Sequence, residues 1–112
     1  MNVYYNSEGL KRLCDDLKEA RRKLGDQAAK KLQLRINELI NAPNLSQIPH
    51  TPPPRLHQLE GRAELTFAVD LHRSLRLVFT VGDKPVPYRD SGGVDKARVY
   101  SVIITFVGDY HE

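Results

Sequence analysis

The sequence predicts one α+β domain, residues 1–112, in which two antiparallel N-terminal helices pack on one face of a small, twisted, mainly antiparallel sheet. Two observations predict this fold class. Apolar residues recur at helical spacing in roughly the first 42 positions, and they alternate with other residues from Leu65 onward. Because the helices come first and the strands follow, the two kinds of element are expected to form separate layers. The length of 112 residues suffices for one modest core.

The first helix is expected from about residue 8 to Lys23. Ser7 is a candidate N-cap, Gly25 supplies a stop, and the apolar face consists of Leu10, Leu13, Cys14 and Leu17. Asp26 can cap a second helix, which Pro43 ends and whose apolar face consists of Ala29, Leu32, Ile36, Leu39 and Ile40. The short turn between the two helices predicts antiparallel packing.

The strands are expected at residues 3–5, 65–71, 75–81 and 98–107. The middle two form a hairpin, and a proline-rich connector, residues 43–55, precedes them. The segment from residue 82 to residue 97 is expected to be a long turn. With the helices on one face, the other face of the sheet is left partly open, and we expect it to display Arg76 and Thr66.

Composition narrows the class of protein. The net charge of +3 and the pI near 9.1 favour contact with polyanions. The single cysteine, Cys14, cannot form an internal disulfide, and no apolar run has membrane-spanning length. The N-terminus lacks the pattern of a signal peptide, so we expect a cytoplasmic protein. The four histidines show no metal-ligand spacing and no phosphate-binding glycine motif occurs, so neither a metal nor a cofactor is expected.

Three segments carry polar residues of chemical interest next to predicted strands: LHQLEG (56–61), FAVDLHRSLRLVF (67–79) and the terminal DYH (109–111). Together they resemble the HigB branch of the RelE/ParE toxin superfamily. Members of that branch carry an LHxLKG-type segment, a strand ending in YRLIF or WRITF, and a closing DYH. The resemblance covers essentially the whole chain, including the helix pair.

The resemblance implies a RelE-like fold and the toxin of a bacterial type II toxin-antitoxin system. Such a toxin is a ribosome-dependent endoribonuclease, or mRNA interferase, that cuts mRNA in the ribosomal A site, blocks translation and inhibits growth. It uses no metal, and a HigA-type helix-turn-helix antitoxin neutralises it. The family's catalytic positions match His57, Arg76, Asp109, Tyr110 and His111. Arg55, Arg62 and Arg73 are the candidate substrate-binding residues.

Metal-free RNA cleavage explains why these residue types are needed. A base must take the proton of the 2′-hydroxyl, cations must stabilise the charge on the phosphorus, and an acid must protonate the leaving 5′-oxygen. His57 and His111 suit both proton roles, in either order, and Asp109 is either the base or a group that orients an imidazole. The fork of Arg76 fits phosphate oxygens, and a base can stack on the ring of Tyr110.

Two departures from the family pattern leave alternatives open. Glu60 stands where the family commonly has lysine, and Arg62 stands where an aspartate often follows the glycine. One alternative is a non-enzymatic ParE-like inhibitor that binds a protein such as gyrase. Another is a decayed toxin retained as an antitoxin-binding partner. Structurally, Arg76 also fits a solvated strand position, and His57 fits a residue that only hydrogen-bonds its loop.

Overall fold

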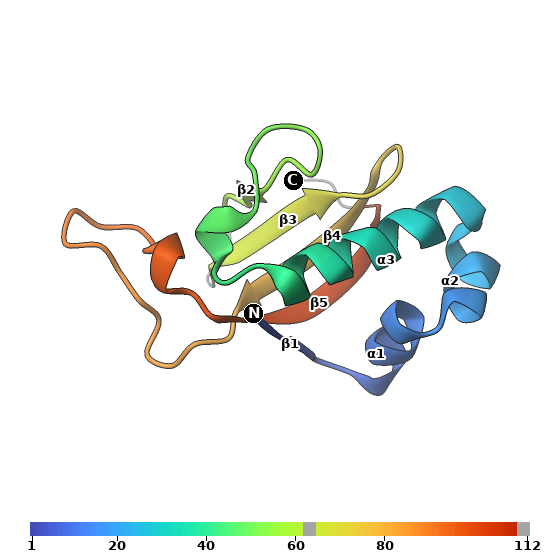
Figure 1. Ribbon diagram of the computed structural model, residues 1–112, viewed down its shortest axis with the longest axis horizontal. Helices are drawn as coiled ribbons and strands as arrows, with labels where there is room; N and C mark the ends of the chain where they lie inside the picture. Colours follow the sequence, from blue (N-terminus) through green and yellow to red (C-terminus); the bar gives the residue numbers. More distant parts are fainter. Residues whose placement is uncertain (62–64, 110–112) are drawn as a thin grey trace.

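The computed structural model describes residues 1–61 and 65–109 and shows an α+β protein with helices on one face of a five-stranded sheet (Figure 1). The strand order is β1-β5-β4-β3-β2. Only the pair β1 and β5 is parallel, and the other three pairs are antiparallel. The strands are β1 (Asn2–Tyr5), β2 (His57–Gln58), β3 (Thr66–Asp70), β4 (Leu75–Val81) and β5 (Ser101–Asp109).

The expected helix from residue 8 to Lys23 is wrong in one respect, because the structure divides it into α1 (Glu8–Asp15) and α2 (Leu17–Leu24). Asp16 is extended between them, and its Oδ1 accepts hydrogen bonds from the amides of Lys18 (3.0 Å) and Glu19 (3.3 Å). An aspartate that caps the following turn competes with the continuous helix. The described part of the chain therefore has three α-helices instead of two, and β1 precedes them.

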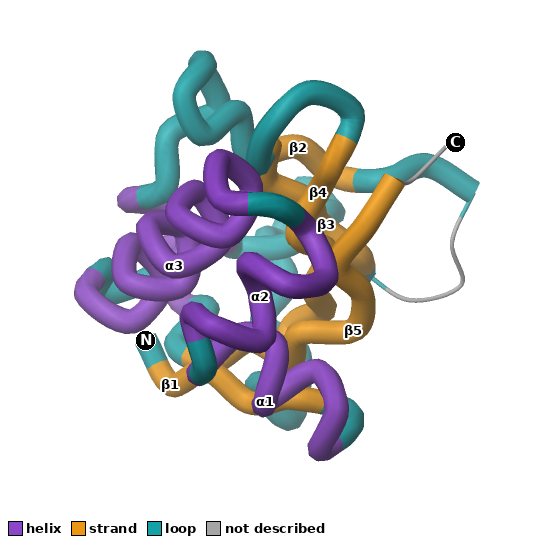
Figure 2. Tube along the Cα trace, turned by 90° about the vertical axis from the view of Figure 1, so that its right-hand side faces the viewer, coloured by secondary structure: helices purple, strands orange, loops and turns teal. Residues whose placement is uncertain are grey.

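The third helix, α3 (Asp26–Asn41), begins after Gly25, which takes the N-cap position expected for Asp26. Ala42 is extended (ψ 135°), as the residue before a proline prefers. The face of α3 that lies on the sheet is buried, but Ile40, expected on that face, is 50% exposed. Figure 2 shows the helices on one side of the strands, with α2 between α1 and α3, both of which it contacts.

The main core lies between the helices and the sheet. Phe67 and Phe79, which face each other in register, stack with their ring centroids 6.2 Å apart. The fully buried residues around them include Leu32, Leu39, Leu77, Val102 and Ile104. This arrangement confirms the predicted β3–β4 hairpin, because the apolar residues at alternate positions face the helices. Within the described residues, none of the helices combines the length and apolar character needed to cross a membrane.

The last strand begins later than expected, at Ser101 instead of residue 98, because a short 3₁₀ helix (Lys96–Arg98) precedes it. Asp83 anchors this region, since its Oδ1 accepts hydrogen bonds from the amides of Tyr100 (3.1 Å) and Ser101 (2.9 Å). The start of the long connection, residues 82–97, is therefore held next to the start of β5.

The sheet face opposite the helices is partly covered. Leu59, which follows β2, packs there with Ala68 and Val78. Thr66, expected on display, is only 5% exposed, because this segment lies against β3 and the amide of Leu59 donates to its carbonyl at 2.8 Å. We call this surface the open face, since Arg76 and Phe106 remain partly accessible on it.

Candidate functional site

Two rows of cross-strand neighbours place the predicted site residues His57 and Arg76 on the open face. In one row Asp70 pairs with Arg76 and Arg76 pairs with Gly108. The second row runs across four strands and consists of His57, Ala68, Val78 and Phe106. Because directly paired residues point to the same side of a sheet, His57 and Arg76 share this face. Their Cα atoms are separated by two residues and two strands, which corresponds to roughly 12 Å.

An arginine–carboxylate cluster occupies the first row. Asp70 accepts two hydrogen bonds from Arg55, through Nε (2.7 Å) and Nη2 (2.8 Å). Its Oδ1 also lies 2.9 Å from Nε of Arg76. Two guanidinium groups thus share one carboxylate. Guanidinium groups attract an anionic phosphate, but here Asp70 competes with it for Arg55 and for Nε of Arg76.

Arg76 is held firmly in this cluster. Its Nη1 donates to the carbonyls of Arg73 and Leu75, both at 3.0 Å, and its side chain is 23% exposed. Nη2 is left without a hydrogen-bond partner among residues 1–61 and 65–109. A fixed guanidinium with one unused N–H group can donate to a phosphate oxygen without first being reoriented.

His57 is half-buried on the edge strand β2. Its Nδ1 lies 2.9 Å from the carbonyl oxygen of Arg55. Because a carbonyl only accepts hydrogen bonds, Nδ1 carries the proton, and Nε2 is the basic nitrogen of the neutral ring. The backbone of Arg55 therefore sets the tautomer of His57, while its side chain binds Asp70.

Asp109 lies on the neighbouring position of β5 and points the other way. It pairs with Leu75, whereas Gly108 pairs with Arg76, so alternation places the Asp109 carboxylate on the face that carries the helices. Ser74 Oγ donates to its Oδ2 at 3.2 Å. The structure thus groups His57, Arg76 and Arg55 on one face and directs Asp109 to the other. Tyr110, His111 and Arg62 lie outside the described residues.

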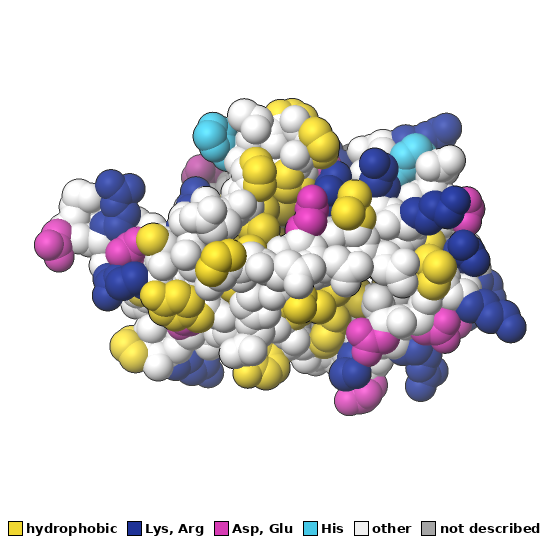
Figure 3. Space-filling model, in the orientation of Figure 1, with side chains coloured by type: hydrophobic (Ala, Val, Ile, Leu, Met, Phe, Trp, Pro, Cys, Tyr) yellow, Lys and Arg dark blue, Asp and Glu magenta, His cyan; other side chains and the backbone are white. Residues whose placement is uncertain are grey.

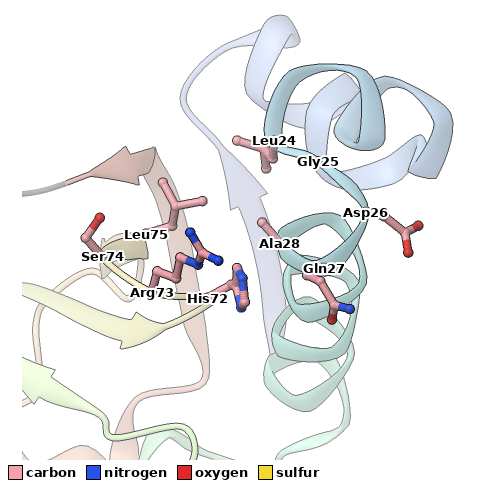
Figure 4. Close-up of a pocket in the computed structure, with 9 residues that line it drawn as sticks. All are labelled: Leu24, Gly25, Asp26, Gln27, Ala28, His72, Arg73, Ser74 and Leu75. Carbon is pink, nitrogen blue, oxygen red and sulfur yellow. The ribbon is translucent and has the colours of Figure 1, made fainter.

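Arg73 lies in the β3–β4 turn with a backbone φ of 55°. Its side chain does not join the open-face cluster but lines a cavity between this turn and the α2–α3 turn, together with His72 and Ser74 (Figure 4). His72, expected to be exposed, is half-buried there. Of the predicted substrate-binding arginines, Arg55 shares the Asp70 carboxylate with Arg76, whereas Arg73 contacts Arg76 through its carbonyl alone.

Sequence reasoning missed Asp70, the residue on which both arginines converge. The signal for it was present, because a hairpin that turns at residues 71–74 brings positions 70 and 76 face to face. It also missed Arg35, which is 3% exposed on α3 and donates through Nε to the Asp70 carbonyl at 2.9 Å. Glu38 compensates its charge at 2.8 Å. Arg35 thus fixes the end of β3 from the helix side.

The titratable groups with the largest pKa shifts lie elsewhere. Burial, reinforced by Asp15, raises the pKa of the Cys14 thiol to about 12. Cys14 is therefore protonated at neutral pH and is unsuited to act as a nucleophile. Within the described ranges, no group of three or more His, Cys, Asp or Glu side chains is arranged to hold a metal ion.

Comparison with known proteins adds no family. No protein-family model and no curated protein sequence matches this chain. The functional assignment therefore depends on the residues and their arrangement.

Proposed function

We propose that this protein is a RelE-like toxin of the HigB type, a ribosome-dependent endoribonuclease that cleaves mRNA by metal-independent attack of a 2′-hydroxyl on the scissile phosphate. The observation that carries the proposal is the position of His57 and Arg76 on one sheet face. These residues come from two separate segments that resemble the family, and the register of β2, β3 and β4 accounts for their proximity.

In this mechanism Nε2 of His57 takes the 2′-hydroxyl proton, because Nδ1 is occupied by the Arg55 carbonyl. Arg76 donates its unused Nη2 to the phosphate oxygens, where negative charge develops. Asp109, Tyr110 and His111 enter through the family resemblance. A carboxylate, an aromatic ring for stacking and a second imidazole complete the set of base, acid and cation that the reaction requires. The two histidines can also exchange roles, with His111 as the base and His57 as the acid.

The proposed partners follow from the same class of toxin. We propose that the protein acts in the cytoplasm, in the ribosomal A site, and that a HigA-type helix-turn-helix antitoxin neutralises it. The open face supports contact with RNA, because Arg76 presents a fixed guanidinium there whose Nη2 can donate to a phosphate oxygen.

The test is induced expression in a bacterium, with growth, protein synthesis and the 5′ ends of cellular transcripts measured together. Wild-type protein is expected to stop growth and to produce new 5′ ends within reading frames. Arg76→Ala is expected to abolish both effects. Arg12→Ala, on the exposed surface of α1, is the matched control and is expected to remain toxic. Unchanged translation with well-expressed, folded wild-type protein would overturn the proposal.

One observation favours a second candidate function. Asp70 occupies Nε of Arg76 and both Nε and Nη2 of Arg55, where a phosphate would otherwise bind. Such a satisfied cluster also suits a non-enzymatic ParE-like inhibitor of a protein such as gyrase, or a decayed toxin retained as an antitoxin-binding partner. Inhibition of gyrase supercoiling by purified wild-type protein, with transcripts left intact, would select the first of these.

A further inference from the structure

A cavity of about 370 Å³ lies at the end of the molecule away from the long β4–β5 connection (Figures 1 and 4). It is formed where the α2–α3 turn approaches the β3–β4 turn. Aliphatic groups of Leu24, Ala28 and Leu75 line it, and Arg73 and His72 lie at the hairpin side. This size is at the lower end of the range of ligand pockets, and it fits one or two side chains of a partner.

The described lining of this cavity carries one guanidinium, Arg73, and one carboxylate, Asp26. Asp26 points away from the hairpin and is already paired with Arg21 (2.9 Å) and Lys30 (3.2 Å) (Figure 4). Glu19 is likewise shared by Arg22 and Lys23. Figure 3 shows Lys and Arg side chains at this end of the molecule, with Asp and Glu side chains among them. Because these carboxylates are already paired, the charge that a ligand in the cavity can complement is that of Arg73, and such a ligand is negatively charged.

Arg73 differs from these paired cations. Its guanidinium makes no hydrogen bond or ion pair within residues 1–61 and 65–109. The backbone of Arg73 has a left-handed φ of 55° in the turn. Non-glycine residues adopt this conformation at a cost. The Arg73 side chain therefore stands beside an aliphatic surface with its charge unmatched, which is an arrangement that suits a carboxylate attached to an apolar group.

The same turn holds two of the candidate catalytic residues. The Arg73 carbonyl accepts from Nη1 of Arg76 at 3.0 Å, and Ser74 Oγ donates to Asp109 at 3.2 Å. The turn is closed by a hydrogen bond from the Leu75 amide to the His72 carbonyl at 3.0 Å. A ligand that contacts Arg73 thus acts on a segment that is hydrogen-bonded to Arg76 and Asp109.

We propose that this cavity binds an acidic, partly apolar peptide segment of a partner protein, with an apolar side chain against Leu24, Ala28 and Leu75 and a carboxylate on Arg73. Binding is transmitted to Arg76 and Asp109 through the turn. Among the residues that the structure describes, the lining is mainly aliphatic, and its one ring is the imidazole of His72. Aliphatic surface beside a guanidinium fits an apolar side chain and a carboxylate better than it fits stacked bases, so a peptide is the ligand that we propose. The binding part of the proposal is independent of the proposed nuclease function.

The test is a titration of the full ¹⁵N-labelled chain, followed by amide NMR signals, with a synthetic peptide of repeated Glu-Leu-Leu-Asp units. The amides of Gly25, Ala28 and Ser74 are expected to shift, and those of Arg76 and Gly108 are expected to follow with the same dissociation constant. A matched peptide of Gln-Leu-Leu-Asn units is expected to bind about tenfold more weakly or worse, because it lacks the charge that meets Arg73.

Variants separate the charge of Arg73 from the shape of the turn. Arg73→Gln and Arg73→Gly are expected to lose about tenfold or more of the affinity, since glycine keeps the left-handed turn but removes the guanidinium. Arg73→Lys is expected to retain most of the binding. Lys84→Gln, in the β4–β5 connection at the other end of the molecule, is the control and is expected to bind as wild type does.

Three outcomes would overturn the inference. These are equal affinity for the acidic and amide peptides, undiminished binding by Arg73→Gly, and tighter binding of oligouridine than of the acidic peptide at the amides of Gly25 and Ala28. Binding without any shift at Arg76 and Gly108 would overturn the transmission to the open face. None of these measurements uses ribosomes, so a failure of the nuclease proposal leaves them unaffected.

Discussion

Arg76 and Arg73 belong to one hairpin and lie three residues apart, yet their surroundings are opposite. Arg76 is held by Asp70 and by two carbonyls and keeps 23% of its side chain exposed. Arg73 is exposed and has no side-chain partner in the described part of the chain. The comparison indicates two uses of a guanidinium. A fixed one suits a reaction that requires charge at a defined point, whereas an unpaired one suits a partner that brings its own carboxylate.

The largest effect is expected from Arg76→Lys. Lysine keeps the charge but loses the planar fork that contacts Asp70 and the two carbonyls at once. We expect the rate of transcript cleavage to fall by about 100-fold to 1000-fold, as for other lost transition-state donors. Single-turnover cleavage of ribosome-bound mRNA measures it. Arg12→Lys is the control, and equal loss in that variant would contradict a specific role for Arg76.

Alkaline pH is expected to weaken the fold itself, through two buried groups that lie away from both arginines. Burial raises the pKa of Cys14 from 9.0 and of Tyr5 from 10.0, in each case to about 12. The folded chain therefore retains these protons where the unfolded chain releases them. The corresponding stability is complete below about pH 9 and is lost as the pH rises toward 12.

Denaturant unfolding at a series of pH values measures this loss. Each group can lower the free energy of unfolding by at most about 1.4 kcal/mol per pH unit in its window. Cys14→Ala is expected to be less stable at neutral pH but to show a shallower decline above pH 9. A decline as steep as that of wild type would show that Cys14 does not contribute.

Asp70→Asn makes the surroundings of Arg76 more like those of Arg73. It removes the charge that both guanidinium groups share, and they then repel each other. We expect unfolding to become easier by about 1 to 2 kcal/mol, between the values for exposed and buried pairs, since Asp70 is 30% exposed. Urea denaturation measures the change. Asp90→Asn, in the exposed β4–β5 connection, is expected to alter stability little.

The smallest effect is expected from Arg73→Gly. The left-handed backbone is relieved, but the unfolded chain gains conformational freedom, so the two contributions oppose each other. The free energy of unfolding should change by less than about 1 kcal/mol. A larger loss would mean that the Arg73 side chain supports the fold, and that the unpaired charge is not its main feature.

Periodicity predicted most of the fold because the β3–β4 hairpin and α3 each direct one regular row of apolar residues into the main core. It did not predict the break at Asp16, because Leu13 and Leu17 keep helical spacing across it, and apolar spacing is insensitive to a cap. The strand β2 has only two residues, too few for alternation to be visible. Apolar periodicity therefore does not predict a helix break that depends on one side-chain cap, nor a two-residue strand that depends on pairing with one neighbouring strand.

The candidate site was predicted by residue type but not by geometry. Arg76 and His57 could be selected from their sequence segments. Finding Asp70 requires the register of the hairpin, and finding Arg35 requires the position of α3 relative to the sheet. Asp109 was grouped with Arg76 because both match catalytic positions of the family that the sequence resembles. The structure separates them, because neighbouring positions across β5 alternate between faces.

Gly108 lies opposite Arg76 and has a close neighbour on its own strand. A Cβ atom at this position would come within 2.9 Å of the Phe106 ring. Even a single methyl group would therefore push an aromatic ring aside next to the guanidinium, while every charge in the row stayed the same. For protein engineering, a substitution at Gly108 would change the shape of the open face without changing its charge.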